Sequence, residues 1–97
     1  MMITLQVDQR ATAAAAKTEY ADQLDNSHSR DQQQSQHTMA EPGIGDGALS
    51  SAFTDGSEVE FTAVLGARIV TFGLIGAGAG AVPHDRLRAL MQTALSH

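Results

Sequence analysis

The sequence predicts an all-α protein: an antiparallel helical hairpin followed by a short C-terminal amphipathic helix. Three observations predict it. The alanine-rich run at 11–16 has high helix propensity. A Pro/Gly-rich turn at 42–47 interrupts the chain near its middle, and the apolar residues beyond it recur at spacings of three and four. With 97 residues, the chain has the length of a single small helical domain with a limited core.

A first helix is predicted from about residue 9 to about residue 36. Asp8 can accept hydrogen bonds from the free amides of its first turn. A weak apolar stripe then follows at helical spacing, made of Val7, Ala11, Ala14, Thr18, Ala21 and Leu24. Beyond Leu24 the sequence is polar on every face. Residues 25–36 are therefore expected to be a solvated or frayed extension of the helix, and the alternative is that residues 25–41 are disordered and fold only on binding.

The segment 41–56 is predicted to reverse the direction of the chain. Pro42 cannot continue a helix. Three glycines follow it closely and allow positive φ, namely Gly43, Gly45 and Gly47.

A second helix is predicted from about residue 58 to about residue 80. Ser57 and Glu60 have the spacing of a capping box, and the glycines between residues 73 and 80 loosen the end of the helix. Its stripe at helical spacing, which is apolar except for Arg68, is Phe61, Leu65, Arg68, Phe72, Ile75 and Ala79. This stripe exceeds what the thin alanine stripe of the first helix can cover, so the sequence predicts an apolar patch that needs a partner.

A last amphipathic helix is predicted from about residue 86 to about residue 95. Asp85 can cap it. Its apolar residues recur with the helical period and are Leu87, Leu90, Met91, Ala94 and Leu95.

No catalytic, metal or cofactor site is predicted. The chain has no cysteine, and its four histidines are scattered at positions 28, 37, 84 and 97. The glycines at 76–80 match neither the dinucleotide-binding spacing nor a phosphate-binding loop. The net charge of −5, with only six basic residues, argues against nucleic acid as a partner. An enzyme is therefore not expected.

Residues 61–82 leave a membrane alternative open, because this stretch carries a single charge, Arg68. Gly76 and Gly80 form a Gly-x-x-x-Gly spacing, which allows close approach of two helices in a membrane or in water, or serves only as a flexible joint. An arginine near a bilayer centre costs about 2.5 kcal/mol or more, so the sequence favours a helix seam outside the membrane.

The layout resembles a known family. The lead-in Ile3-Thr4-Leu5-Gln6-Val7-Asp8, the alanine-rich helix, a Gly-Asp turn followed by Ala48-Leu49-Ser50-Ser51-Ala52-Phe53, and a second apolar helix resemble the WXG-like and EspC-like small helical-hairpin proteins of actinobacterial type VII secretion. There is no Trp-x-Gly at the turn. The family's export signal is Tyr-x-x-x-Asp/Glu, and after Tyr20 the acidic position is occupied by Leu24. The resemblance implies a hairpin that pairs with itself or with another small helical protein.

The predicted function is that of a non-enzymatic interaction protein, either a secretion-associated factor or an adaptor that forms a homo- or hetero-oligomer. The alternative is a small membrane-associated protein with residues 61–82 inserted. No secretory signal stands at the start of the sequence, which leaves a signal-peptide-independent route or the cytoplasm. The predicted partner interface is Phe61, Leu65, Phe72, Ile75, Gly76, Gly80, Leu87, Leu90 and Met91.

Overall fold

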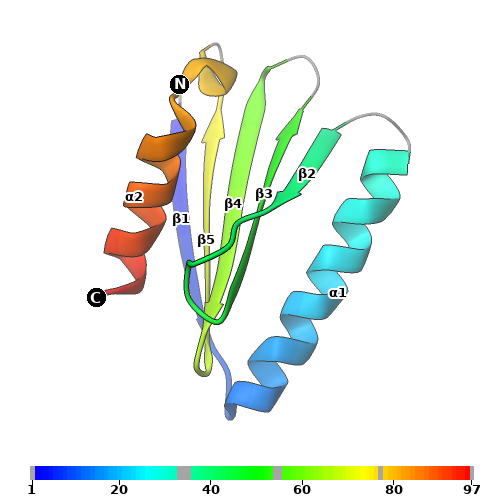
Figure 1. Ribbon diagram of the computed structural model, residues 1–97, viewed down its shortest axis with the longest axis vertical. Helices are drawn as coiled ribbons and strands as arrows, with labels where there is room; N and C mark the ends of the chain where they lie inside the picture. Colours follow the sequence, from blue (N-terminus) through cyan, green and yellow to red (C-terminus); the bar gives the residue numbers. More distant parts are fainter. Residues whose placement is uncertain (1, 33–35, 54–55, 77, 97) are drawn as a thin grey trace.

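The computed structural model describes residues 2–32, 36–53, 56–76 and 78–96, with side chains for all of these except 27–32 and 36. Its main feature is a five-stranded antiparallel sheet, accompanied by two α-helices (Figure 1). The prediction of an all-α helical hairpin is therefore wrong.

The sheet is built from β1 (Met2–Gln9), β2 (Gln36–Ala40), β3 (Gly47–Phe53), β4 (Glu58–Leu65) and β5 (Arg68–Ile75). Its spatial order is β1-β5-β4-β3-β2, and every neighbouring pair is antiparallel. β1, the first strand of the chain, is thus one edge strand and lies beside β5, the last strand. β2 is the other edge strand.

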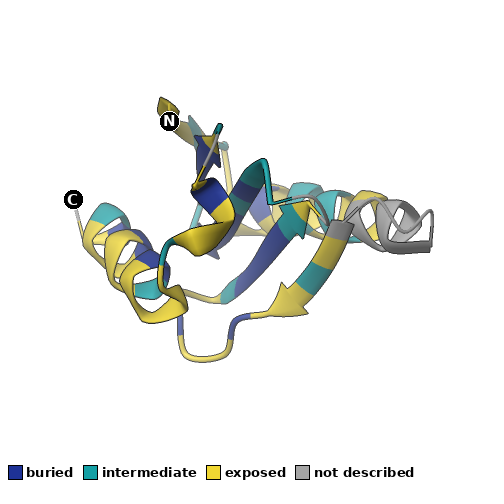
Figure 2. Ribbon diagram, turned by 90° about the horizontal axis from the view of Figure 1, so that it is seen from above, coloured by how far each residue is buried: buried dark blue, intermediate teal, exposed yellow. Residues whose placement is uncertain are grey.

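The two helices lie on opposite sides of the sheet (Figure 2). α1 (Ala13–Gln32) connects β1 to β2, and α2 (His84–Leu95) follows the short 3₁₀ turn η1 (Ala79–Ala81) after β5. We call the side of the sheet that each helix covers the α1 face and the α2 face.

The larger core lies between the sheet and α2. Phe61 of β4 and Phe72 of β5 lie opposite each other in the register, and their rings stack with centroids 5.5 Å apart. Stacked aromatic pairs of this kind add to the burial of their area. The other buried members of this core are Ile44, Ala48, Val59, Ala63, Val70, Leu74, Ala79, Leu87, Met91 and Leu95.

The core on the α1 face is much smaller. Ala16 of α1 packs on Val64 of β4 and Ile69 of β5, with the half-buried Tyr20 beside them. Because α1 contributes small and polar side chains to this face, little apolar area is buried beneath it.

The segment predicted as a helix over 58–80 is instead the hairpin β4–β5 followed by η1. The physical reason is that helices cover both faces of the sheet, so successive residues such as Ala63 and Val64 are both buried, and the alternation typical of a strand is lost. Gly66, at φ +59°, begins the two-residue connection between the strands. A glycine between two runs rich in β-branched residues is a hairpin signal, and here it outweighs the helical spacing.

The first predicted helix, over 9–36, begins too early and extends too far. Residues 2–9 are β1, and the backbone N–H of Arg10 still bonds to the β5 side of the sheet at Ala67. α1 starts at Ala13, where the Thr12 hydroxyl accepts a hydrogen bond from the Ala15 N–H at 3.1 Å. It ends at Gln32, residues 33–35 lie outside the described part, and β2 follows.

The Pro/Gly segment at 42–47 connects β2 to β3 and reverses the chain, with Gly43 and Gly45 at φ +82° and +56°. α2 spans 84–95, and Asp85 lies in its first turn while Pro83 occupies the N-cap position. Within the described ranges, neither helix has the length and apolar character needed to cross a membrane.

Candidate interaction surface

β1 forms one edge of the sheet, and within the described residues β5 is the one strand that pairs with it. In an antiparallel pair, residues that exchange hydrogen bonds alternate with residues that do not. Arg10 continues the register opposite Ala67, and its N–H donates to the Ala67 carbonyl at 2.8 Å. The even-numbered residues of β1 therefore direct their N–H and C=O groups at β5. The odd-numbered residues, which are Ile3, Leu5, Val7 and Gln9, direct theirs away from the sheet.

Three of these outward-bonding residues also carry apolar side chains that face solvent. Ile3, Leu5 and Val7 lie on the α2 face and are 67%, 63% and 53% exposed. We call them the β1 row. Their partners on β5 are buried, so α2 covers β5 and stops short of β1.

Leu90 of α2 adds a fourth exposed apolar side chain on this side, at 46% exposure. Arg88 of the same helix reaches the connection between β2 and β3, where it donates to the Pro42 carbonyl. Two residues along a helix rotate the side chain by about 200°, so Leu90 points away from Arg88 and toward the β1 side of the molecule.

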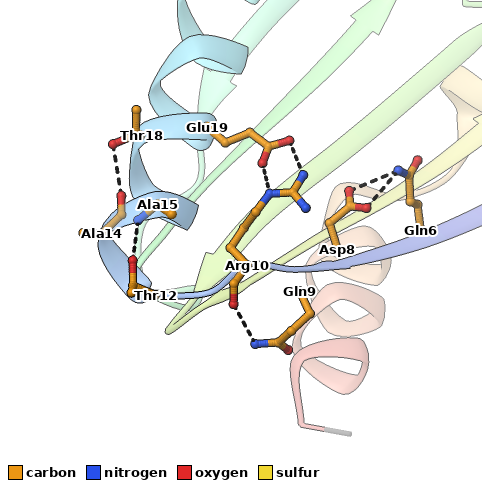
Figure 3. Close-up of polar contacts among 9 residues, drawn as sticks. All are labelled: Gln6, Asp8, Gln9, Arg10, Thr12, Ala14, Ala15, Thr18 and Glu19. Atoms are coloured by element: carbon orange, nitrogen blue, oxygen red, sulfur yellow. Dashed lines mark hydrogen bonds and ion pairs between the residues drawn. The ribbon is translucent and has the colours of Figure 1, made fainter.

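The even-numbered side chains of β1 lie on the α1 face, and all of them except Met2 at the start of the strand are polar. The Gln6 amide donates to a carboxylate oxygen of Asp8 at 3.0 Å (Figure 3), and the Thr4 hydroxyl donates to the Gly73 carbonyl at 3.5 Å. β1 therefore has one apolar and one polar face, which is the alternation of a half-buried strand. In this chain, the apolar half is uncovered.

The end of β1 is tied to α1 by an ion pair. The Arg10 guanidinium donates to both carboxylate oxygens of Glu19, with Nη2 and Oε1 2.6 Å apart (Figure 3). This two-point hydrogen bond lowers the pKa of Glu19 and raises that of Arg10. The pair holds the chain where the strand turns into the helix.

A polar cleft of about 280 Å³ lies between α1 and the sheet. Carboxylates, amides and hydroxyls line it, contributed by Gln6, Asp8, Glu19, Gln23, Asn26, Glu60, Thr62 and Thr71, with Leu49. Glu19 is engaged by Arg10, Asp8 by Gln6, and the Thr62 hydroxyl lies 3.4 Å from that of Thr71. The cleft is the polar counterpart of the small core under α1.

A buried carboxylate lies beside β2, at the other edge of the sheet. The side chain of Glu41, directly after β2, is 2% exposed. The Ser50 hydroxyl donates to its Oε2 at 2.8 Å. Nε2 of His84 and Nη1 of Arg88 each lie 2.8 Å from its Oε1. The carboxylate is thus satisfied from β3 and from α2, as a buried charge requires.

The order of these groups does not match a nucleophilic triad. Such a triad needs an imidazole between the hydroxyl and the carboxylate, so that the imidazole takes the hydroxyl proton. Here the Glu41 carboxylate stands between Ser50 and His84, and each of them bonds to it. The arrangement therefore fastens β2, β3 and α2 together.

A groove of about 450 Å³ runs beside this cluster on the α2 face, between β2 and the start of α2. Its apolar walls include Met39, Val59, Val82 and Leu87, and it also contains His37 and His84. Among the residues that the structure describes, no three His, Asp or Glu side chains gather as metal ligands.

The residues predicted as the partner interface fall into different surroundings. Four of them are buried in the core of the α2 face: Phe61, Phe72, Leu87 and Met91. In this conformation they have almost no surface to offer a partner. Their apolar character serves the core between the sheet and α2.

Of the remaining predicted interface residues, Leu65 is partly buried, while Ile75 and Leu90 are 38% and 46% exposed. Gly76 and Gly80 lie on either side of the start of η1 and do not share a helix face. Gly80 lies close to the backbone of Gly56, and its N–H donates to the Gly56 carbonyl at 3.1 Å.

Sequence reasoning missed the β1 row, although a signal for it was present. Residues 3–8 alternate strictly between apolar and polar side chains, the pattern of a strand with one apolar face. Interpreting these residues as a lead-in to a helix concealed the pattern.

Comparison with protein-family models, with curated proteins and with solved structures gives no match. The resemblance to WXG-like and EspC-like helical hairpins is wrong, because the chain forms a five-stranded sheet with two helices and matches no family model.

Proposed function

We propose that this chain is a non-enzymatic protein-interaction module that binds its partner by strand addition at β1. The observation that supports this most directly is the coincidence of two features on the same three residues. The β1 row exposes more than half of each apolar side chain, and the same residues have their backbone N–H and C=O groups free of β5. Strand addition satisfies the backbone groups and buries the side chains together.

The composition of β1 supports the same proposal. Natural edge strands are blunted by charges, prolines, bulges or short length, because an open edge otherwise pairs with another chain. β1 is eight residues long, contains no proline, and has one charged residue, Asp8, whose side chain lies on the α1 face. An edge of this kind is suited to pairing.

Site-specific photocrosslinking in cells of the source organism tests the proposal. A photoreactive amino acid placed at Leu5 should give a discrete crosslinked species of defined mass. The same amino acid at Lys17, an exposed position on α1, should not. The absence of any crosslink at Leu5 above the Lys17 level would contradict strand addition, whichever protein the partner is.

A further inference from the structure

We propose that the strand added to β1 is β1 of a second copy of this chain, so that two molecules form one continuous ten-stranded antiparallel sheet around a twofold axis at Leu5. This inference rests on the proposed function and names its partner. Three observations support it: the register in which β1 can pair with itself, the placement of charge on the chain and on β1, and the difference between β1 and the other edge strand, β2.

The backbone of β1 matches itself in this register. Two antiparallel strands exchange hydrogen bonds only where outward-facing residues of one lie opposite outward-facing residues of the other. With Leu5 opposite Leu5 of the second copy, Ile3 lies opposite Val7, and all of these residues direct their backbone groups outward. Every hydrogen-bonding position along the β1 row then finds a partner.

The side chains match in the same register. On the α2 face, the β1 row of one copy lies beside the β1 row of the other, so each apolar side chain has an apolar neighbour. On the α1 face, Thr4 lies opposite Gln6, and Asp8 lies opposite Met2. Moving the axis by one residue to Gln6 would place Ile3 opposite Gln9 at both ends and would leave two apolar pairs in place of three.

Charge favours this edge for contact between two copies. The chain carries a net charge of −5, so two copies repel each other overall. In the Leu5 register, the two Asp8 side chains are six residues apart along the sheet, a distance of roughly 20 Å. At physiological salt, this separation exceeds the screening length of about 8 Å.

A twofold pairing also gives a closed assembly. Pairing of β1 with β2 of the next copy would continue without end and would give fibres. β2 is five residues long and lies against α1, and its outward-facing residues on the described edge, Thr38 and Ala40, carry small side chains on the α1 face. The two edges do not match each other, whereas β1 matches itself.

Sedimentation equilibrium of the full chain tests the dimer. We expect the wild-type chain to form a concentration-dependent dimer with no larger species. Leu5→Lys should raise the dimer dissociation constant about a hundredfold or more, because it places two like charges opposite each other at the axis and removes two apolar side chains. Met39→Lys, which changes a side chain of similar exposure at the other edge, should leave the dissociation constant unchanged.

A backbone variant distinguishes loss of the dimer from loss of the fold. Val7→Pro removes an N–H that points away from β5, so the monomer should keep its circular dichroism spectrum while the dimer is lost. A wild-type chain that stays monomeric at all accessible concentrations would overturn the proposal. So would a dimer that survives both Leu5→Lys and Val7→Pro.

Cysteine crosslinking tests the register, since the chain has no cysteine of its own. In the Leu5→Cys variant, the two Cα atoms would lie about 5.5 Å apart across the axis, within the range that a disulfide spans. Mild oxidation should therefore crosslink Leu5→Cys at least tenfold faster than Ile3→Cys. An equal mixture of Ile3→Cys and Val7→Cys should crosslink as a heterodimer. Equal rates for Leu5→Cys and Ile3→Cys would overturn the twofold register.

The dimer and the proposed function can fail separately. If the purified chain is monomeric but Leu5 crosslinks to a different protein in cells, strand addition stands and the second copy is excluded. If Leu5 crosslinks to nothing in cells and the purified chain is monomeric, both are excluded.

Discussion

The two edges of this sheet are built in opposite ways. β2 is short, lies against α1, and continues directly into Glu41, which is buried and bonded from β3 and α2. β1 is longer, has no cover on its α2 face, and is tied to α1 at its end by the ion pair between Arg10 and Glu19. Apolar side chains are exposed along β1, while the β5 residues opposite them, Val70, Phe72 and Leu74, are buried.

The two edges therefore differ in how they are protected from pairing with another chain. A protein that must only avoid aggregation protects both edges. Here the protection is concentrated at β2, and the long edge combines apolar side chains with unbonded backbone groups. The asymmetry is what a closed dimer requires, because one edge has to pair and the other has to end the sheet.

The largest effect is expected from proline on the bonded side of β1. Gln6→Pro removes an N–H that points at β5, and it should lower the free energy of unfolding by roughly 3 kcal/mol. Val7→Pro, one residue further, should cost far less because its N–H points outward. Urea unfolding monitored by circular dichroism measures both. Equal losses for the two variants would contradict the assignment of the outward-facing residues.

A smaller loss is expected at the protected edge. Glu41→Ala leaves the Ser50 hydroxyl without its acceptor and separates Arg88 from its carboxylate, so it should lower the free energy of unfolding by about 2 kcal/mol. Asp22→Ala, at an exposed position of α1, is the matched control and should change it by less than about 0.5 kcal/mol. If the two variants are equally stable, the buried carboxylate does not hold β2 in place.

The sequence predicts some elements of this fold and misplaces others for physical reasons. The alanine run marks α1, the Leu87–Leu95 pattern marks α2, and Pro42 with its glycines marks the reversal between β2 and β3. β4 and β5 are wrongly predicted as a helix, because burial on both faces removes the alternation that distinguishes a strand.

The candidate surface was harder to predict than the elements. The alternation of residues 3–8 indicates a strand with one apolar face, but which of its backbone groups point away from the sheet depends on its pairing with β5, about 65 positions away in the chain. The Glu41 cluster likewise joins residues from three separate segments, so its acid, serine, histidine and arginine have no common spacing.

A modest pH dependence is expected at the tether of β1. The pKa of Glu19 is lowered in the folded chain by Arg10. A lowered folded pKa contributes stability that is present above the unfolded pKa of Glu and is lost as the pH falls through the folded pKa. Carboxyl NMR titration should show the Glu19 pKa moving back toward its ordinary value in Arg10→Gln. An unchanged Glu19 pKa in that variant would show that the pair is not formed.

The smallest effect concerns Tyr20, which packs between α1 and the sheet on the β3 side, close to Gly47. Burial raises the pKa of its phenol. The corresponding stability is present below the ordinary tyrosine pKa and is lost as the pH rises through the folded value. Because the chain has one tyrosine and no tryptophan, ultraviolet absorbance titration reads this group directly. A folded midpoint equal to that of the urea-unfolded chain would place Tyr20 in solvent.

Hydrogen exchange of individual β1 amides, followed by NMR at low and at high protein concentration, tests the central claim most directly. The amides of Thr4, Gln6 and Asp8 should be protected at both concentrations because they bond to β5. Those of Ile3, Leu5 and Val7 should exchange rapidly in the dilute monomer and become protected as the dimer forms. If the odd-numbered amides stay unprotected at high concentration, or if the even-numbered ones are never protected, β1 is not an edge that pairs.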